Sequence, residues 1–209
     1  MTQSRSIFLS AGVPDPAAKH FMGEGDTAAI SAVISALLYV ALGRRRIVWG
    51  GHPSITPMIW AYAEALDVDY GKWVTLYQSK LFEPDFPEEN ARFKNVVLTE
   101  AVPGDRERSL ELMRRQMLSE SSFSAAVFAG GMGGILDEYR LFREMAVDAV
   151  ILPIASTGGA SAILAKEINA SRDFSDELDY VDLLFTRLGI DPNEKRGEAI
   201  PSSNKDKSL

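Results

Sequence analysis

The chain has 209 residues, 24% of them charged, and a formal net charge of −7 at neutral pH. It has no cysteine and only two histidines, His20 and His52, which excludes a disulfide framework, cysteine-ligated metal centres and a histidine-rich metal site. We therefore predict no metal and no cofactor. The excess of acidic over basic residues and the lack of a long basic stripe argue against nucleic acid as a partner.

The apolar segments of the sequence are too short to cross a membrane. Residues 7–9 cannot form the core of a signal peptide, and residues 28–42 fall short of the ~18 apolar residues that a span requires. We expect a soluble, cytoplasmic protein without a membrane partner. The length favours a single domain over residues 1–190, followed by a polar, disordered tail over residues 191–209.

The first predicted elements are a buried strand and an apolar helix. The strand covers residues 7–12 and ends at a turn that contains two prolines. Asp26 then caps a helix whose apolar residues recur at helical spacing. The basic run at residues 44–46 closes this helix, because cations oppose the negative end of the helix dipole. The alternative use of this run is a patch for a polyanion.

Short apolar segments and helical patterns alternate along the rest of the chain. Further strands are predicted over residues 47–49, 73–78, 95–100, 125–129 and 149–154. Helices are predicted from residue 56, over residues 105–119 and 136–145, through residue 166 and over residues 180–188. A polar loop separates the third and fourth strands. The pattern predicts an α/β fold, a Rossmann-like three-layer sandwich with a mostly parallel sheet of about six to seven strands.

Glycine and other small residues gather where four predicted strands end. These residues are Ser10, Ala11, Gly12, Gly50, Gly51, Gly130, Gly131, Met132, Gly133, Gly134, Ser156, Thr157, Gly158 and Gly159. The carboxyl ends of parallel strands meet at one sheet edge, and a glycine loop that opens a helix presents free N–H groups to an anion. Each loop alone would be explained by a short turn, but together the four loops predict a phosphate-bearing ligand.

None of these loops has the spacing of a standard nucleotide-binding motif. The sequence contains neither GxGxxG with an acidic residue some way beyond it nor GxxxxGK[ST]. We therefore predict neither an NAD-dependent oxidoreductase nor a P-loop NTPase.

The third glycine loop resembles the signature PGGxGTxxE of LOG proteins in the SLOG superfamily, which also includes DprA-like proteins. Ala129 stands in place of the proline, and Gly134 in place of the glycine before threonine. With one extra loop residue, Glu138 takes the glutamate position, whereas an ungapped match would place Asp137 there. The preceding helix carries residues 114–117, RRQM, which are similar to a second LOG element, RKxxM.

Three further segments look like a bacterial SLOG subfamily found beside defence proteins. They are residues 8–16, 48–57 and 152–160, so the resemblance covers about residues 6–168. It implies one of two functions. Sensor SLOG domains bind ADP-ribose-like or cyclic ADP-ribose-like molecules and signal to an effector protein, for example in antiviral defence. LOG enzymes are phosphoribohydrolases that cleave the N-glycosidic bond of nucleoside 5′-monophosphates.

We favour sensing over hydrolysis, and a structural subunit with an empty cleft is a third class. In a hydrolase, Glu138 would stabilise the oxocarbenium-like ribose or activate water, and Arg114 or Arg115 would hold the phosphate or orient the carboxylate. The alternatives are an acidic residue that merely favours the helix dipole and arginines on a solvated helix face. Because LOG relatives are dimers, the resemblance also implies a homodimer.

Three other polar side chains are predicted to face the ligand. Gln78 and Arg106 would meet ribose hydroxyls or a second phosphate, and His52 would donate a hydrogen bond to a phosphate or ribose oxygen. His52 as a turn residue without a ligand is the alternative. No motif aims His52 at Ser54 or Ser156, so a Ser-His-Asp triad is not predicted.

Overall fold

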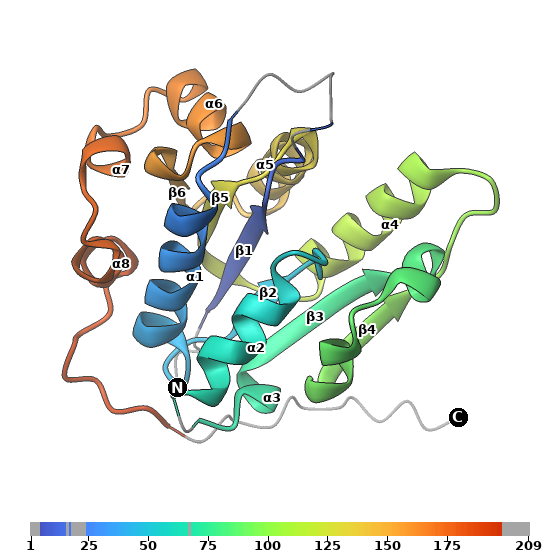
Figure 1. Ribbon diagram of the computed structural model, residues 1–209, viewed down its shortest axis with the longest axis horizontal. Coiled ribbons are helices and arrows are strands. Elements are labelled where there is room, and N and C mark those ends of the chain that lie inside the picture. Colours follow the sequence, from blue (N-terminus) through green and yellow to red (C-terminus); the bar gives the residue numbers. More distant parts are fainter. Residues whose placement is uncertain (1–4, 16, 18–23, 67, 198–209) are drawn as a thin grey trace.

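The computed structural model describes residues 5–15, 17, 24–66 and 68–197, so His20 lies outside the described residues. Six parallel strands form one sheet in the order β4-β3-β2-β1-β5-β6 (Figure 1). The strands are β1 (Ser6–Gly12), β2 (Ile47–Trp49), β3 (Val74–Ser79), β4 (Asn95–Thr99), β5 (Phe123–Gly130) and β6 (Val150–Ile154). The predicted Rossmann-like α/β sandwich is confirmed, and every strand pair of this sheet is parallel.

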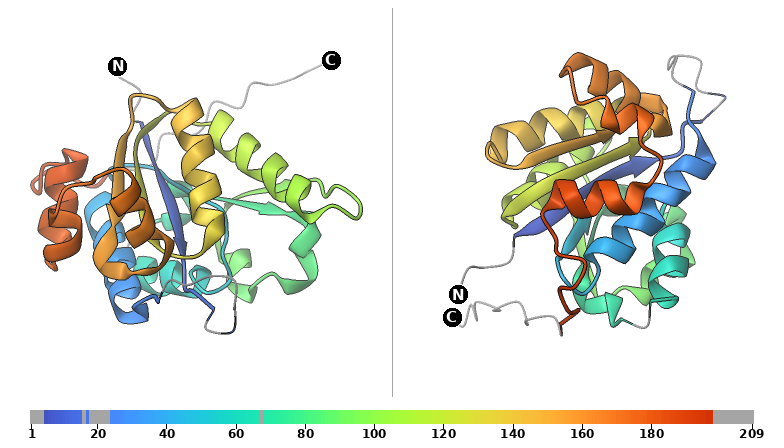
Figure 2. Two further views of the ribbon diagram at one scale, coloured as in Figure 1. Left: turned by 90° about the horizontal axis from the view of Figure 1, so that it is seen from above. Right: turned by 90° about the vertical axis from the view of Figure 1, so that its left-hand side faces the viewer.

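Helices cover both faces of the sheet (Figure 2). The α-helices are α1 (Thr27–Ala41), α2 (Thr56–Glu64), α3 (Tyr70–Trp73), α4 (Arg106–Ser119), α5 (Gly133–Met145), α6 (Gly159–Glu167), α7 (Asp173–Asp176) and α8 (Tyr180–Leu188). The α1, α2 and α8 helices pack together on one face, and α4, α5 and α6 on the other. Three 3₁₀ helices are η1 (Lys80–Asp85), η2 (Glu88–Arg92) and η3 (Ala155–Thr157).

The strands are apolar on both faces because each face has its own core. Ile7 and Leu9 of β1 belong to the core under α1, whereas Phe8 between them belongs to the core under α5. The ring of Phe8 stacks on Phe142 of α5 with 5.4 Å between the centroids. Such two-sided burial requires a continuous apolar run and not a polar–apolar alternation, which is the pattern of the sequence.

The predicted helix ends are confirmed by side-chain hydrogen bonds. The carboxylate of Asp26 accepts from the N–H groups of Ala28 and Ala29, at 2.8 and 3.0 Å. At the other end of α1, Arg44 Nη1 donates to the Val40 carbonyl at 2.9 Å. This favours the interpretation of the basic run as a helix end, where a cation meets the last free carbonyls.

The structure differs from the sequence expectations in two segments. The polar loop after β3 is not irregular, since it contains η1 and η2. Residues 191–197, expected to begin a disordered tail, contact the end of α1, where Glu194 forms an ion pair with Arg45 at 2.5 Å. Residues 198–209 lie outside the described residues. Among the described helices, none combines the length and apolar character that a transmembrane segment needs.

Candidate functional site

The strand order reverses beside β1. From β1 the chain builds outward through β2, β3 and β4, and it then returns to add β5 and β6 on the opposite side. The loops that follow β1 and β5 therefore meet, and the N–H of Gly131 donates to the carbonyl of Gly12 at 2.6 Å. Ligands of open α/β sheets bind at this kind of switch point. A pocket of about 420 Å³ opens here, within the usual range for small-molecule sites.

The pocket brings together most of the residues predicted from the sequence. The predicted residues that line it are Ser10, Ala11, Gly12, Gly50, Gly51, His52, Gln78, Arg106, Arg114, Gly131, Met132, Gly134 and Glu138. The predicted residues outside its lining are Arg115, Gly130, Gly133, Ser156, Thr157, Gly158 and Gly159. Three of the four predicted loops thus converge on the pocket, and the fourth does not.

The fourth loop supports the glycine loop from behind. Thr157 Oγ1 accepts from the N–H of Gly130 at 2.8 Å, and the N–H of Ala160 donates to the carbonyl of Gly131 at 2.9 Å. Ser156 instead shares a hydrogen bond of 2.9 Å with Tyr180 of α8. These contacts hold the backbone of the glycine loop in position, so the expected direct role of residues 156–159 at a phosphate has no geometric support.

The backbone of the glycine loop opens directly into α5. Gly131 has a φ of +68°, a conformation that favours glycine, and it turns the chain from β5 into the helix. The α5 helix begins at Gly133, so two glycines of the loop already belong to its first turn. The first N–H groups of a helix have no partner within it, and they carry the positive end of the helix dipole. This end of the pocket is therefore suited to an anion.

A charged cluster lies below the glycine loop. Ser10 Oγ donates to Glu138 Oε2 at 2.6 Å, and Arg114 Nε donates to Glu138 Oε1 at 3.4 Å. The side chains of Arg114 and Glu138 are only 10% and 16% exposed. Asp137 pairs with Arg114 at 3.6 Å, but its side chain is 48% exposed and does not line the pocket. Of the two carboxylates that the resemblance offered, Glu138 is the one at the pocket.

Arg115 points away from this cluster. Its Nε donates to Glu111 at 2.8 Å, one helical turn earlier, and about half of its side chain is exposed. The solvated helix face is therefore the correct interpretation for Arg115, while Arg114 is the arginine that reaches the pocket.

His52 lines the pocket beside Gly12. Its Nδ1 accepts from the N–H of Ser54 at 3.3 Å, and Ser54 Oγ lies 2.8 Å from the same atom. An acceptor at Nδ1 places the ring proton on Nε2, which becomes a donor beside Gly12. Burial within the concave pocket lowers the pKa of His52, although the residue keeps exposed surface. The Ser54 contact is local to the turn, since Ser54 does not line the pocket.

Both ends of the Gln78 side-chain amide form hydrogen bonds within the protein. Its Nε2 donates to the Gly51 carbonyl at 3.3 Å, and its Oε1 accepts from Asn90 at 2.6 Å. The side chain is 4% exposed. Gln78 therefore ties η2 to the loop after β2 while it lines the pocket, and its predicted contact with ribose hydroxyls stays a prediction.

Several lining residues were not predicted from the sequence. Phe82, Asp85 and Phe86 come from the segment expected to be a polar loop, and Leu110 and Met113 come from α4. Phe82 and Phe86 are aromatic residues within a mostly polar segment. They are the sequence signal for an apolar pocket wall.

Trp49 at the end of β2 also lines the pocket. It is 1% exposed, and among the described residues its indole N–H has no hydrogen-bond partner. Buried donors are nearly always satisfied, so this unpaired indole N–H is an exception within the core that Trp49 shares with Ile7 and Leu9.

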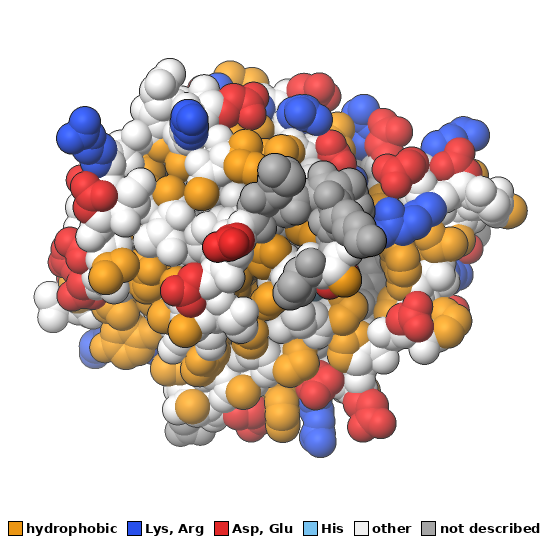
Figure 3. All heavy atoms as spheres, turned by 45° about the horizontal axis from the view of Figure 1, so that its top comes forward, with side chains coloured by type: hydrophobic (Ala, Val, Ile, Leu, Met, Phe, Trp, Pro, Cys, Tyr) orange, Lys and Arg blue, Asp and Glu red, His pale blue; other side chains and the backbone are white. Residues whose placement is uncertain are grey.

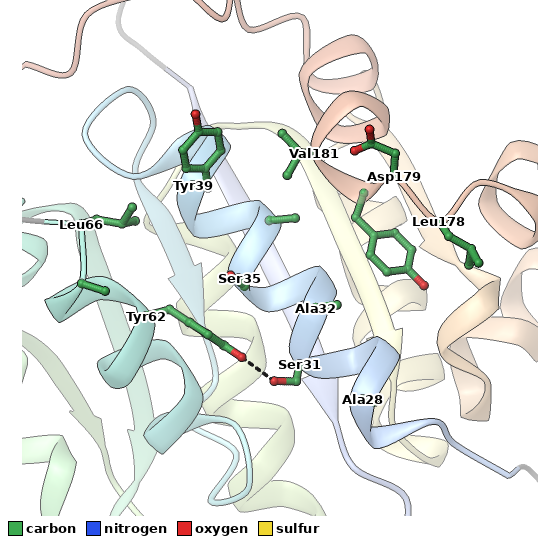
Figure 4. A pocket seen from close by; sticks show the side chains of 13 residues that line it. Ala28, Ser31, Ala32, Ser35, Tyr39, Tyr62, Leu66, Leu178, Asp179 and Val181 are labelled. Carbon is green, nitrogen blue, oxygen red and sulfur yellow. Dashed lines mark hydrogen bonds between the residues drawn. The ribbon is translucent and has the colours of Figure 1, made fainter.

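A second hollow, of about 730 Å³, lies between α1, α2 and α8 (Figure 4). Alanine and serine side chains form its floor, and Ser31 shares a hydrogen bond of 2.7 Å with Tyr62. Asp179 is its one charged lining residue, and it contains no residue predicted as functional. The pocket at the strand ends is therefore the candidate site.

Charges on the molecule are mixed. On the face shown in Figure 3, lysine and arginine side chains are dispersed among aspartate and glutamate and form no continuous stripe. Within the described part of the chain, no group of three or more His, Cys, Asp or Glu side chains is placed to hold a metal ion.

One protein-family model matches the greater part of the chain. The model of the SLOG cluster3 family matches residues 20–188, which include every element of the pocket except β1 and its loop. The search of curated proteins found no match for the chain.

Proposed function

The chain belongs to the SLOG cluster3 family, and from this premise we propose that it is a sensor that binds a nucleotide-derived ligand in the pocket at the strand ends. The ligand is an ADP-ribose-like or cyclic ADP-ribose-like molecule, and the signal passes to an effector protein in a defence response. Both the homodimer and the cytoplasmic location stay predictions.

The anion end of the pocket supports this proposal. The first turn of α5 offers N–H groups and a positive dipole end, and Gly131 lets a phosphate approach the backbone. The guanidinium of Arg114 lies directly behind Gly134, so it adds a positive charge on the same side. The Nε2–H of His52 is a further donor for ligand oxygens.

The state of Glu138 favours binding over cleavage. A glycosidase needs a carboxylate oxygen that is free to face the reacting sugar carbon. Both oxygens of Glu138 are engaged, one by Ser10 and the other by Arg114, and little of the side chain is exposed. Each oxygen keeps a second lone pair, but only 16% of the side chain is exposed, so a sugar carbon has little access to it. This is the observation that carries the choice of a sensor.

A thermal-shift screen combined with chromatography tests the proposal. AMP, ADP-ribose, cyclic ADP-ribose isomers and NAD are added separately, and each sample is then analysed for free base. We expect a rise in the melting temperature with intact ligand, since a ligand at 100 times its Kd adds about 2.7 kcal/mol. The Glu138→Ala variant should also bind. If no nucleotide raises the melting temperature, the proposal is wrong.

The alternative function is hydrolysis of a nucleoside 5′-monophosphate. It is favoured by the presence of a carboxylate, an arginine and a serine hydroxyl in contact at the base of the glycine loop. Release of free base by the native chain, and its loss in Glu138→Ala, would replace the sensor with this enzyme.

A further inference from the structure

The two ends of the pocket differ in chemistry. The α5 end is made of glycine backbone and Arg114, whereas the opposite end is made of aromatic side chains from η1. These ends follow β5 and β3, which are three strand spacings apart in the sheet. At ~4.8 Å per spacing the axes of these two strands are roughly 14 Å apart, and the side chains of Phe82 and Arg114 line the pocket between them. A single phosphate cannot reach both, but an extended molecule with a phosphate at one end can.

The aromatic end is a rigid wall. Ser79 Oγ accepts from the N–H of Leu81 at 3.3 Å and so caps η1 at its start. The chain of hydrogen bonds from Asn90 through Gln78 to Gly51 fixes the following segment to the loop after β2. The wall is therefore formed before any ligand arrives, which lowers the entropy cost of binding against it.

Phe82 and Arg106 stack on each other at this wall, with the guanidinium of Arg106 over the Phe82 ring. The guanidinium carbon of Arg106 lies 5.6 Å from the centre of the Phe82 ring, and both residues line the pocket. The Arg106 side chain is 65% exposed, so it is accessible to a ligand. Aromatic rings and guanidinium planes are the groups on which nucleobases stack in proteins.

We infer that Phe82 and Arg106 are the base subsite of this pocket, where a purine ring stacks while its phosphate lies at the first turn of α5. The inference rests on the proposed function, because it assigns the two ends of one nucleotide to the two ends of the pocket. It makes Phe82 a specificity-determining residue that distinguishes a nucleotide from a bare sugar phosphate.

Calorimetric titration with AMP and with ribose 5-phosphate measures the contribution of the base end apart from that of the phosphate end. AMP carries adenine at C1′ of the ribose, where ribose 5-phosphate carries a hydroxyl group. The native chain should bind AMP at least about tenfold more tightly than ribose 5-phosphate, the effect expected of one stacked base. The Phe82→Ala variant should lose that about tenfold preference and bind ribose 5-phosphate as the native chain does. The Phe82→Trp variant should restore it.

The matched control is Leu81→Ala. Leu81 is the preceding residue of η1, similarly half-buried, and it does not line the pocket. It should leave both affinities unchanged, and urea unfolding of all variants verifies that they fold. Equal weakening of both probes by Phe82→Ala, or equal affinity of the native chain for both, would overturn the base subsite while leaving phosphate binding intact. If neither probe binds, the proposed function fails together with it.

Discussion

Arg114 is the residue that connects the anion end of the pocket to the carboxylate. It contacts Glu138 at 3.4 Å and Asp137 at 3.6 Å, and its guanidinium lies against Gly134. It is nearly buried, so its charge is weakly screened by solvent. Both the stability of the folded chain and the affinity for an anion should depend on it.

We predict that Arg114→Ala lowers the free energy of unfolding by about 1–3 kcal/mol, because Glu138 is left buried without its cationic donor. Arg115→Ala is the matched control. It removes only an exposed pair with Glu111, and it should cost about 0.5 kcal/mol or less. Urea unfolding measures both. Equal losses in the two variants would contradict the role assigned to Arg114.

His52 should make the stability depend on pH. Burial lowers its pKa in the folded chain from the ordinary value of 6.5, so the unfolded chain takes up the proton first as the pH falls. The stability from neutral His52 is complete above about pH 6.5 and is lost as the pH falls through the lowered pKa.

The His52→Asn variant keeps an acceptor near Ser54 but does not titrate in this range. Urea unfolding of the native chain and the variant at pH 7.5 and pH 5.5 should show that their stability difference shifts toward the variant at the lower pH. A difference that is independent of pH would show that the pKa of His52 is not lowered.

At the level of elements, the start of α5 determines the anion site. A Cβ on Gly131 would overlap the side chain of Ile135 in the first helical turn, and φ is +68° there. By contrast, a Cβ on Gly133 would have no heavy atom within 4 Å. Position 131 therefore requires a glycine, whereas position 133 has room for a side chain.

We predict that Gly131→Ala lowers the free energy of unfolding by about 1–3 kcal/mol and weakens AMP binding, because Ile135 and the first turn of α5 must move. Gly133→Ala should leave the stability unchanged or raise it by up to about 1 kcal/mol, since alanine favours a helix. Unfolding and calorimetry of both variants provide the measurement. Unchanged AMP binding in a folded Gly131→Ala variant would place the anion elsewhere.

On the scale of the whole molecule, the segment after α8 completes the domain. Ile190 is 3% exposed in the core, and the following residues contact the end of α1. The Arg44 Nε donates to the Glu194 carbonyl at 2.6 Å, and the N–H of Gly197 donates to Gly43 at 2.8 Å. The folded unit thus extends to residue 197 and not to residue 190.

A chain that ends at residue 190 should be less stable than one that ends at residue 197 by about 2 kcal/mol. It loses the ion pair of Glu194 with Arg45 and the charge-assisted bonds of Arg44. Thermal unfolding of the two truncated chains measures the difference. Identical melting temperatures would show that residues 191–197 contribute nothing to the fold.

The elements and the loops that carry the site can be predicted from the amino-acid sequence. The strand and helix pattern, the cap at Asp26, and the glycines after β1, β2 and β5 could all be predicted. Each depends on residues a few positions apart, because side-chain periodicity, capping and turn geometry are local properties.

Which of these parts contact one another depends on the packing of the folded chain. Strand pairing joins segments that are far apart, so the order of the sheet placed Ser10 against Glu138, 128 residues away, and moved residues 156–159 behind the glycine loop. The same packing turned a polar loop into the aromatic wall with Phe82 and engaged Gln78 with Asn90. Such contacts depend on the packing of the whole chain, and no local pattern in the sequence specifies them.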